Sequence, residues 1–106
     1  MEKRAFQRMP ACIEFHCFET EYFGTVTDIS EKGMFIRSQK ICFPLDLKFK
    51  ISISLEKDIL YIPVKIKRIT KSNGYYDGMG VVLLKRPHIY LKLINKLRIQ
   101  LRRNNY

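Results

Sequence analysis

The chain has 106 residues, of which 46% are hydrophobic and 12% aromatic, so it can bury one hydrophobic core and is not a disordered chain. Its formal net charge of +10 favours an anionic partner such as a nucleic acid, a nucleotide, an acidic protein or a membrane surface, with a merely soluble basic protein as the alternative. The N-terminal residues lack the apolar segment of a secretory signal, and no run approaches the roughly 20 apolar residues of a membrane span, so we expect a cytoplasmic protein without a transmembrane segment.

The N-terminal segment, residues 1–9, is predicted to be a loop that carries two arginines. Arg4 and Arg8 lie four residues apart in the sequence RAFQR, and Pro10 disfavours a helical conformation for the residue before it. Each guanidinium offers a planar set of donors that suits a phosphate or the edge of a guanine. The same spacing recurs in RIQLR, residues 98–102, where it is typical of a solvated helix surface, so the spacing alone is not diagnostic.

Six strands are predicted between residues 10 and 84, because apolar residues recur there with a period of two. The alternation is clearest at residues 47–55 and 60–67, and the Glu-Lys-Asp sequence between them indicates a hairpin turn. The other strands are expected at about residues 11–18, 22–29, 34–38 and 79–84. The Asn-Gly sequence at residues 73–74 indicates a further turn, and Pro63 indicates an edge strand or an irregularity. Six short strands at hairpin spacing predict a small antiparallel barrel or sandwich.

A helix is predicted at residues 87–103, because Pro87 suits a first helical turn and apolar residues then recur at steps of three and four. This apolar stripe consists of Tyr90, Ile94, Leu97 and Leu101. We expect it to cap the barrel and to leave in water a basic face formed by Lys92, Lys96, Arg102 and Arg103. The chain is therefore predicted to form a single domain over residues 1–106, all-β with a C-terminal helix.

A second motif, DISEKG, ends the second predicted strand. Strand alternation would turn Thr27 and Ile29 inward and place Asp28 and Ser30 together on the outer face. A carboxylate can accept from the N–H groups of guanine, a hydroxyl can donate to a phosphate oxygen, and Gly33 can adopt a positive φ where the backbone passes close to a ligand. Aspartate, serine and glycine are also ordinary turn residues, so a purely structural turn is the alternative.

These two motifs, in this order and twenty residues apart, resemble the signature of the PilZ domain, the bacterial receptor module for cyclic di-GMP. The resemblance extends to the GMFIRS sequence at residues 33–38 and to the GMGV sequence at residues 78–81, which is followed by the predicted helix. It implies a six-stranded antiparallel β-barrel with a C-terminal helix. It also implies that cyclic di-GMP binds outside the barrel and that the arginine loop folds over the ligand.

The resemblance implies ligand contacts for five residues of the two motifs, namely Arg4, Arg8, Asp28, Ser30 and Gly33. The arginines would contact phosphates and guanine, the aspartate a guanine edge and the serine the polar rim of the ligand, while the glycine would allow close approach. Secondary candidates for contact are Lys3, Arg37, Arg68 and Gly80.

Two of these secondary candidates mark departures from the family pattern. Lys3 lies where family members often have a further arginine that influences how many ligands bind, so the stoichiometry stays open. Some members stack a tryptophan on a guanine from a later strand. This chain has no tryptophan, and Arg68 is the candidate to replace it by planar stacking.

Other residue groups favour packing over chemistry. Cys12, His16 and Cys17 raise the possibility of a metal site, but the two cysteines have opposite parity on a strand and would point to opposite faces. The three cysteines, which include Cys42, are expected to be reduced thiols. No paired carboxylates, nucleophile elbow or phosphate loop occurs, so we expect neither an enzyme nor a cofactor besides the ligand.

Aromatic residues of the predicted strands are expected mostly in the core, and these are Phe15, Phe18, Tyr22, Phe23, Phe35, Phe43 and Phe49. Tyr75 and Tyr76 are expected in a turn, where exposed rings among basic residues could stack on nucleobases.

The favoured function is a cyclic di-GMP receptor in which the ligand orders the arginine loop and so signals to an unknown downstream protein. One alternative is a basic barrel that binds RNA or single-stranded DNA. Another is a PilZ-like domain that makes protein contacts and has a silent ligand site. Whether the chain is a monomer or a dimer stays open.

Overall fold

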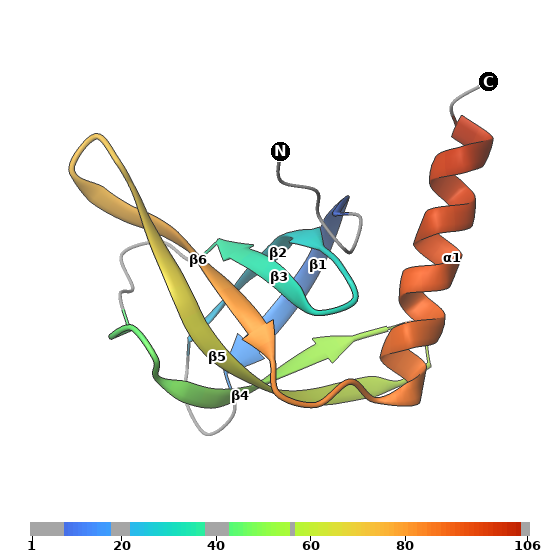
Figure 1. The fold of residues 1–106 in the computed structure, drawn as a ribbon, viewed down its shortest axis with the longest axis horizontal. Helices are drawn as coiled ribbons and strands as arrows, with labels where there is room; N and C mark the ends of the chain where they lie inside the picture. The colour runs from blue at the N-terminus through green and yellow to red at the C-terminus, as the bar shows by residue number, and fades with distance from the viewer. Residues whose placement is uncertain (1–7, 18–21, 38–42, 56, 105–106) are drawn as a thin grey trace, which may run out of the picture.

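The computed structural model describes residues 8–17, 22–37, 43–55 and 57–104. Within these ranges the chain forms six antiparallel strands that close into a barrel in the order β1-β2-β3-β6-β5-β4, and one helix follows them (Figure 1). The elements are β1 (Met9–Cys17), β2 (Phe23–Ile29), β3 (Gly33–Arg37), β4 (Lys48–Ser54), β5 (Ile59–Ser72), β6 (Tyr75–Leu83) and α1 (His88–Asn104). This architecture confirms the predicted six-stranded barrel with a C-terminal helix.

The core follows the predicted alternation most closely in β4 and β5. The inward side chains Ile51, Ile53, Leu60, Ile62, Val64 and Ile66 are all buried.

In β1, Cys12 is exposed and Cys17 is buried, which confirms that the two thiols point to opposite faces. Pro63 lies inside β5, but its carbonyl accepts from the Leu84 N–H just beyond the end of β6. The N–H and C=O of one residue point to the same side of a strand, so the Pro63 nitrogen also faces Leu84, beyond the end of β6. The missing N–H therefore removes no hydrogen bond from the β5–β6 ladder.

The alternation fails in β2, and a bulge explains the failure. Val26 and Ile29 are both fully buried although they are three residues apart. The β2–β3 register shifts between Val26 and Asp28, so Thr27 is an extra residue without a partner on β3. The predicted inward position of Thr27 is therefore wrong, because Val26 takes the inward place and Thr27 is only half-buried.

The core prediction for aromatic residues is right for some rings and wrong for others. Phe15 is fully buried, and Phe43 and Phe49 pack against the core. Tyr22 and Phe23 are instead 45% and 65% exposed, and Phe35 is half-buried on the outer face. Apolar residues occur on both faces of these strands, so alternation could not say which set faces inward; Phe18 lies outside the described residues.

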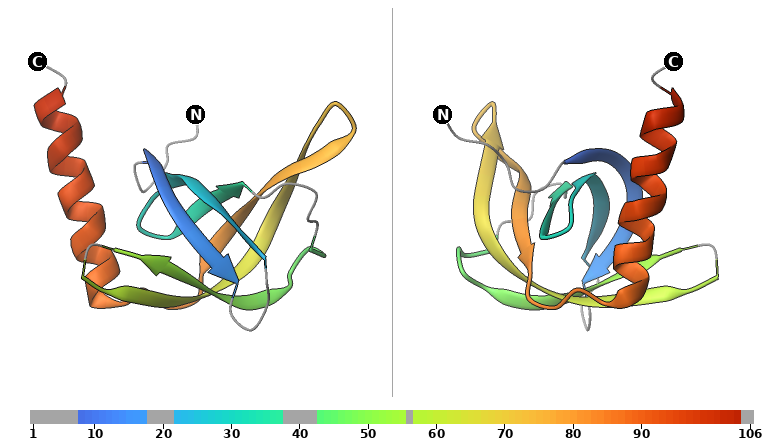
Figure 2. Two further views of the ribbon diagram at one scale, coloured as in Figure 1. Left: turned by 180° about the vertical axis from the view of Figure 1, so that it is seen from behind. Right: turned by 45° about the vertical axis from the view of Figure 1, so that its right-hand side comes forward.

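The β5–β6 hairpin is longer than predicted and projects beyond the barrel (Figures 1 and 2). Its turn is the predicted Asn73-Gly74, with positive φ angles of 53° and 82° that suit a tight hairpin. The prediction of Tyr75 and Tyr76 in a turn is wrong, because they are the first two residues of β6.

Helix α1 stands beside the barrel, and its C-terminal end points away from β4 and β5 (Figure 2). Tyr90 and Ile94 are buried in the core cluster, while Leu97 and Leu101 are only partly buried against it. The predicted apolar stripe thus makes the contact with the barrel, most completely in the first two helical turns. Among the described residues, no helix has the length and apolarity needed to cross a membrane.

Candidate ligand-binding site

The two sequence motifs meet where β1 begins and β2 ends. Arg8 immediately precedes β1, and the register pairs Pro10 with Asp28. The Arg8 Nε donates to the Asp28 Oδ1 at 3.2 Å, and the two side chains are 25% and 37% exposed. A partly exposed ion pair stabilises a fold by only about 1 kcal/mol or less, so its groups can exchange partners at low cost. Arg4 and Lys3, the other candidate residues of this segment, lie outside the described residues.

Ser30 does not lie beside Asp28 on the outer face as the alternation predicted. It is 8% exposed, and its hydroxyl accepts from the Gly33 N–H at 3.3 Å while lying 3.2 Å from the Gly33 carbonyl. The Ser30 N–H also donates to that carbonyl, at 2.8 Å. Strand β2 ends at Ile29, so Ser30 is no longer part of the alternation and closes the β2–β3 turn instead.

Gly33 is required for a different reason from the predicted one. It does not adopt a positive φ, since Gly74 is the glycine of the described residues that does. A Cβ built on Gly33 would instead lie 2.7 Å from the Val81 carbonyl oxygen, because β6 passes close to this turn. The glycine thus permits close packing of two strands.

A row of cross-strand partners runs from Asp28 of the DISEKG motif across the outside of the barrel. Asp28 of β2 pairs with Phe35 of β3, Phe35 pairs with Gly80 of β6, and Gly80 pairs with Arg68 of β5. We call these four residues the motif row. Neighbouring residues on the same strands, such as Met34 and Met79, point into the core, so the motif row faces outward.

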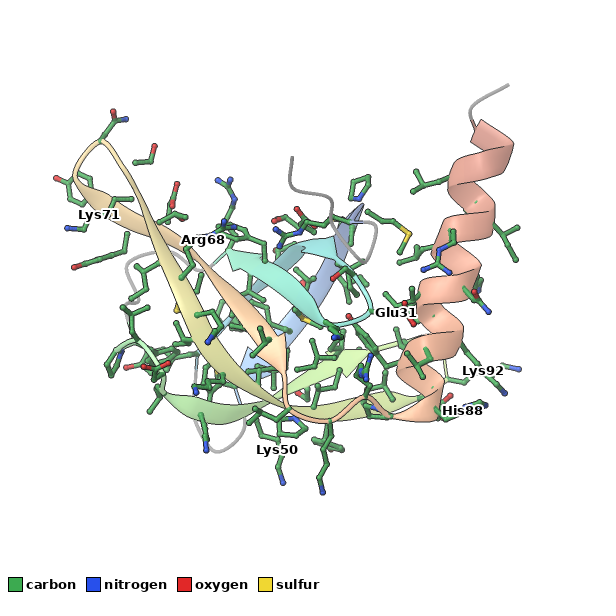
Figure 3. The ribbon with its side chains drawn as sticks, viewed as in Figure 1. Glu31, Lys50, Arg68, Lys71, His88 and Lys92 are labelled. Carbon is green, nitrogen blue, oxygen red and sulfur yellow. The ribbon has the colours of Figure 1, made fainter. Side chains whose placement is uncertain are left out.

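The glycines of β6 make the motif row a flat shelf. A Cβ on Gly78 would lie 2.5 Å from two carbons of the Phe35 ring, so the ring lies directly over that backbone. Gly80 leaves room for Arg68, whose Cβ and Nε would be 3.5 Å from an added Cβ. The Arg68 guanidinium carbon lies 5.8 Å from the centre of the Phe35 ring, within cation–π range. Figure 3 shows Arg68 projecting from β5 near the end of β3.

The family assignment agrees with this geometry. The PilZ domain family model matches residues 2–98, which is most of the chain and contains both motifs. The chain belongs to the PilZ domain family. No curated protein matches the sequence of this PilZ domain.

Solved structures share the fold of this PilZ domain at low sequence identity. The inhibitor of motility MotI/DgrA from Bacillus subtilis has a TM-score of 0.78 at 15% identity, over 100% of this chain and 54% of that chain. YcgR from Escherichia coli in complex with c-di-GMP has a TM-score of 0.74 at 13% identity, over 97% of this chain and 47% of that chain. The PilZ domain of YcgR with c-di-GMP has a TM-score of 0.73 at 11% identity, and 97% of each chain is covered. This PilZ domain thus spans about half the length of the first two proteins.

Helix α1 is tied to the motif of this PilZ domain by one buried hydrogen bond. The Tyr90 hydroxyl donates to the Ser30 carbonyl oxygen at 2.5 Å. Burial, and secondly the negative charge of Glu31, raise the pKa of Tyr90 above its ordinary value, which keeps the phenol protonated as a donor. Sequence periodicity identified Tyr90 as a core residue but gave no sign of this bond.

The remaining sequence candidates of this PilZ domain are Arg37, which lies near the motif row, and the possible metal site. Arg37 is exposed at the end of β3, on the outward parity of Phe35, so it flanks the shelf. Phe35 itself was missed as a site residue, although its position between buried Met34 and Ile36 could have revealed it. Among the described residues, no three histidine, cysteine, aspartate or glutamate side chains cluster as a metal site.

Proposed function

We propose that this PilZ domain is a receptor for cyclic di-GMP, which binds on the outer face of the barrel between the arginine motif and the motif row, and that it has no catalytic role. The observation that carries this proposal is the contact between the Arg8 Nε and the Asp28 Oδ1 at 3.2 Å, which joins the two halves of the family signature. Family membership and the c-di-GMP complexes of the structurally similar YcgR support the choice of ligand.

The residues suit the chemistry of a cyclic dinucleotide with two phosphates and two guanines. Arg8, together with Arg4 and Lys3 from the preceding segment, would contact phosphates and guanine through charge-assisted hydrogen bonds. Asp28 would accept from the N–H groups of a guanine edge. Ser30 and Gly33 would act by holding the turn that presents the aspartate, since their polar atoms bond to each other.

The shelf of the motif row would contact the face of the second guanine of the ligand. Arg68 lies flat over Gly80 and close to Phe35, so its guanidinium plane can stack on a guanine where other family members use tryptophan. Arg37 would add positive charge at the border of the shelf. Ligand binding would draw the arginine segment onto the barrel, and a downstream protein would recognise the altered surface.

Isothermal titration calorimetry with cyclic di-GMP tests this function. The wild-type chain should bind, and Arg8→Ala should weaken binding more than tenfold, since loss of one partner of a charge-assisted contact costs about 2–5 kcal/mol. Arg98→Ala is the matched control, because Arg98 belongs to the other Arg-x-x-x-Arg sequence, on α1, and should bind like the wild type. A folded wild-type chain that gives no heat at micromolar concentrations would exclude the proposal and leave the ligand-silent alternative.

A further inference from the structure

A second row of cross-strand partners lies on another part of the outer barrel surface, across β2, β1, β4 and β5. Phe23 pairs with His16, His16 pairs with Ser52, and Ser52 pairs with Tyr61. We call these four residues the aromatic row. It shares no residue with the motif row and uses β1 and β4, which the motif row does not use.

The rings of the aromatic row are exposed to solvent. Phe23 is 65% exposed and Tyr61 is 53% exposed, and His16 is also exposed. The His16 and Phe23 ring centres are 5.9 Å apart with their planes tilted by 34°. Neighbouring strands lie roughly 4.8 Å apart, so the row places aromatic faces over a path of about 14 Å from Phe23 to Tyr61.

Lysines continue from the aromatic row along β4 and β5. Lys50 and Lys48 follow Ser52 at two-residue steps on the outward face of β4, and Lys65 is the cross-strand partner of Lys48. Figure 3 shows Lys50 pointing away from the barrel, on the side opposite Arg68. Among the described residues, the acidic groups facing this surface are Glu14 on β1 and Asp46, whose Oδ1 lies 3.7 Å from the Lys65 Nζ. Within this part of the chain, positive charge therefore predominates next to the exposed rings.

We infer that the aromatic row and its lysines form a binding surface for single-stranded nucleic acid, separate from the cyclic di-GMP site. Bases stack on exposed aromatic rings in a sequence-tolerant way, and lysines beside them neutralise the phosphates of the same strand. A second copy of the chain fits less well, because each copy carries a net charge of +10 and the two surfaces would repel. A duplex fits less well because its bases are already stacked on each other.

Fluorescence anisotropy with a labelled oligothymidylate of about 12 nucleotides tests this inference on the full chain without cyclic di-GMP. The wild type should bind it more tightly than a duplex of the same length. Phe23→Ala and Tyr61→Ala should each weaken binding about five- to a hundredfold, the range measured for loss of one stacked base. Tyr61→Phe keeps the ring and should bind like the wild type.

The salt dependence of oligonucleotide affinity distinguishes the contribution of the lysines from that of the rings. The variant with both Lys48→Ala and Lys50→Ala should show a shallower fall of log affinity with log salt, by roughly 0.7 for each lysine that contacts a phosphate. Tyr75→Ala is the control for an exposed ring outside the row, since Tyr75 is 74% exposed on the hairpin, and it should not alter binding.

Three results would overturn the inference, provided circular dichroism shows each variant to be folded. One is no binding of the oligonucleotide at low salt. Another is equal affinity for duplex and single strand together with no effect of Phe23→Ala, which would mean charge attraction alone. The third is a dimer in sedimentation analysis that Phe23→Ala dissociates, which would assign the surface to a second copy.

Discussion

The motif row and the aromatic row are built in the same way, since each is a line of cross-strand partners on the outside of a closed barrel, but they present different surfaces. The motif row contains Gly80, and Gly78 beside it lies under the Phe35 ring, so side chains there lie flat. In the aromatic row Phe23 and Tyr61 are exposed to solvent. The glycines of β6 therefore explain why one outer row of this barrel forms a shelf for a compact ligand, whereas the other presents exposed rings to an extended one.

The two rows also differ in what connects them to the rest of the chain. The motif row begins at Asp28, which contacts Arg8, and the following turn accepts the Tyr90 hydrogen bond from α1. A ligand on this row can therefore influence both the N-terminal segment and the helix. The aromatic row has lysines as its neighbours along β4, which adds charge for a longer anion.

The largest expected effect is that a substitution in either row weakens the binding of one ligand and not of the other. Asp28→Ala should weaken cyclic di-GMP binding by about 2–5 kcal/mol and leave oligonucleotide binding intact or slightly tighter, because it removes a negative charge. Phe23→Ala should weaken oligonucleotide binding and leave cyclic di-GMP binding intact. Calorimetry and anisotropy measured on both variants check this, and equal losses for both ligands in both variants would show one shared site.

A smaller effect should separate Gly80, which belongs to the motif row, from Gly33, which lies at the end of the turn after Asp28. Gly33→Ala places a Cβ 2.7 Å from the Val81 carbonyl oxygen and should lower the free energy of unfolding by about 1–3 kcal/mol. Gly80→Ala meets Arg68 atoms at 3.5 Å, an ordinary contact, and should change it by about 0.5 kcal/mol or less. Urea denaturation followed by circular dichroism measures both, and equal destabilisation would refute the steric explanation.

Tyr90→Phe tests the link between the motif row and α1. It removes the donor to the buried Ser30 carbonyl and should cost about 1–2 kcal/mol of unfolding free energy. Because the folded pKa of Tyr90 is raised above 10.0, the folded state holds this proton more tightly, so wild-type stability should fall as the pH rises above 10. That fall should be shallower in Tyr90→Phe. Tyr75→Phe, at a ring that is 74% exposed on the hairpin, is the matched control and should match the wild type.

The smallest effect is expected in the β5–β6 hairpin, which belongs to neither row. The Lys71 Nζ lies 4.8 Å from the centre of the Tyr76 ring, so Lys71→Ala should destabilise the fold by about 0.5–1 kcal/mol at most. Thermal unfolding measures this change. Cyclic di-GMP affinity should be unchanged, and a tenfold loss would extend the ligand site onto the hairpin.

The presence of six strands, the helix and the two motifs could be predicted from the sequence, because alternation and helical spacing are local properties of the chain, but the full length of β5 and β6 could not. The sequence also assigned Arg8 and Asp28 to one ligand site through the family signature, which stays a prediction, and the structure places the Arg8 Nε 3.2 Å from the Asp28 Oδ1. It placed Ser30 outward, gave Gly33 a positive φ and put Phe35 in the core, and the structure contradicts all three.

Which outward residues become neighbours depends on the tertiary structure. Alternation reports the face of a strand that a side chain occupies, but not its partner on the next strand, which depends on turn lengths and bulges. The bulge turns Thr27 out of the core, the end of β2 at Ile29 leaves Ser30 in the turn, and the register joins Asp28 to Arg68 across four strands. The same register brings Phe23 and Tyr61, which are 38 residues apart in the sequence, into one row.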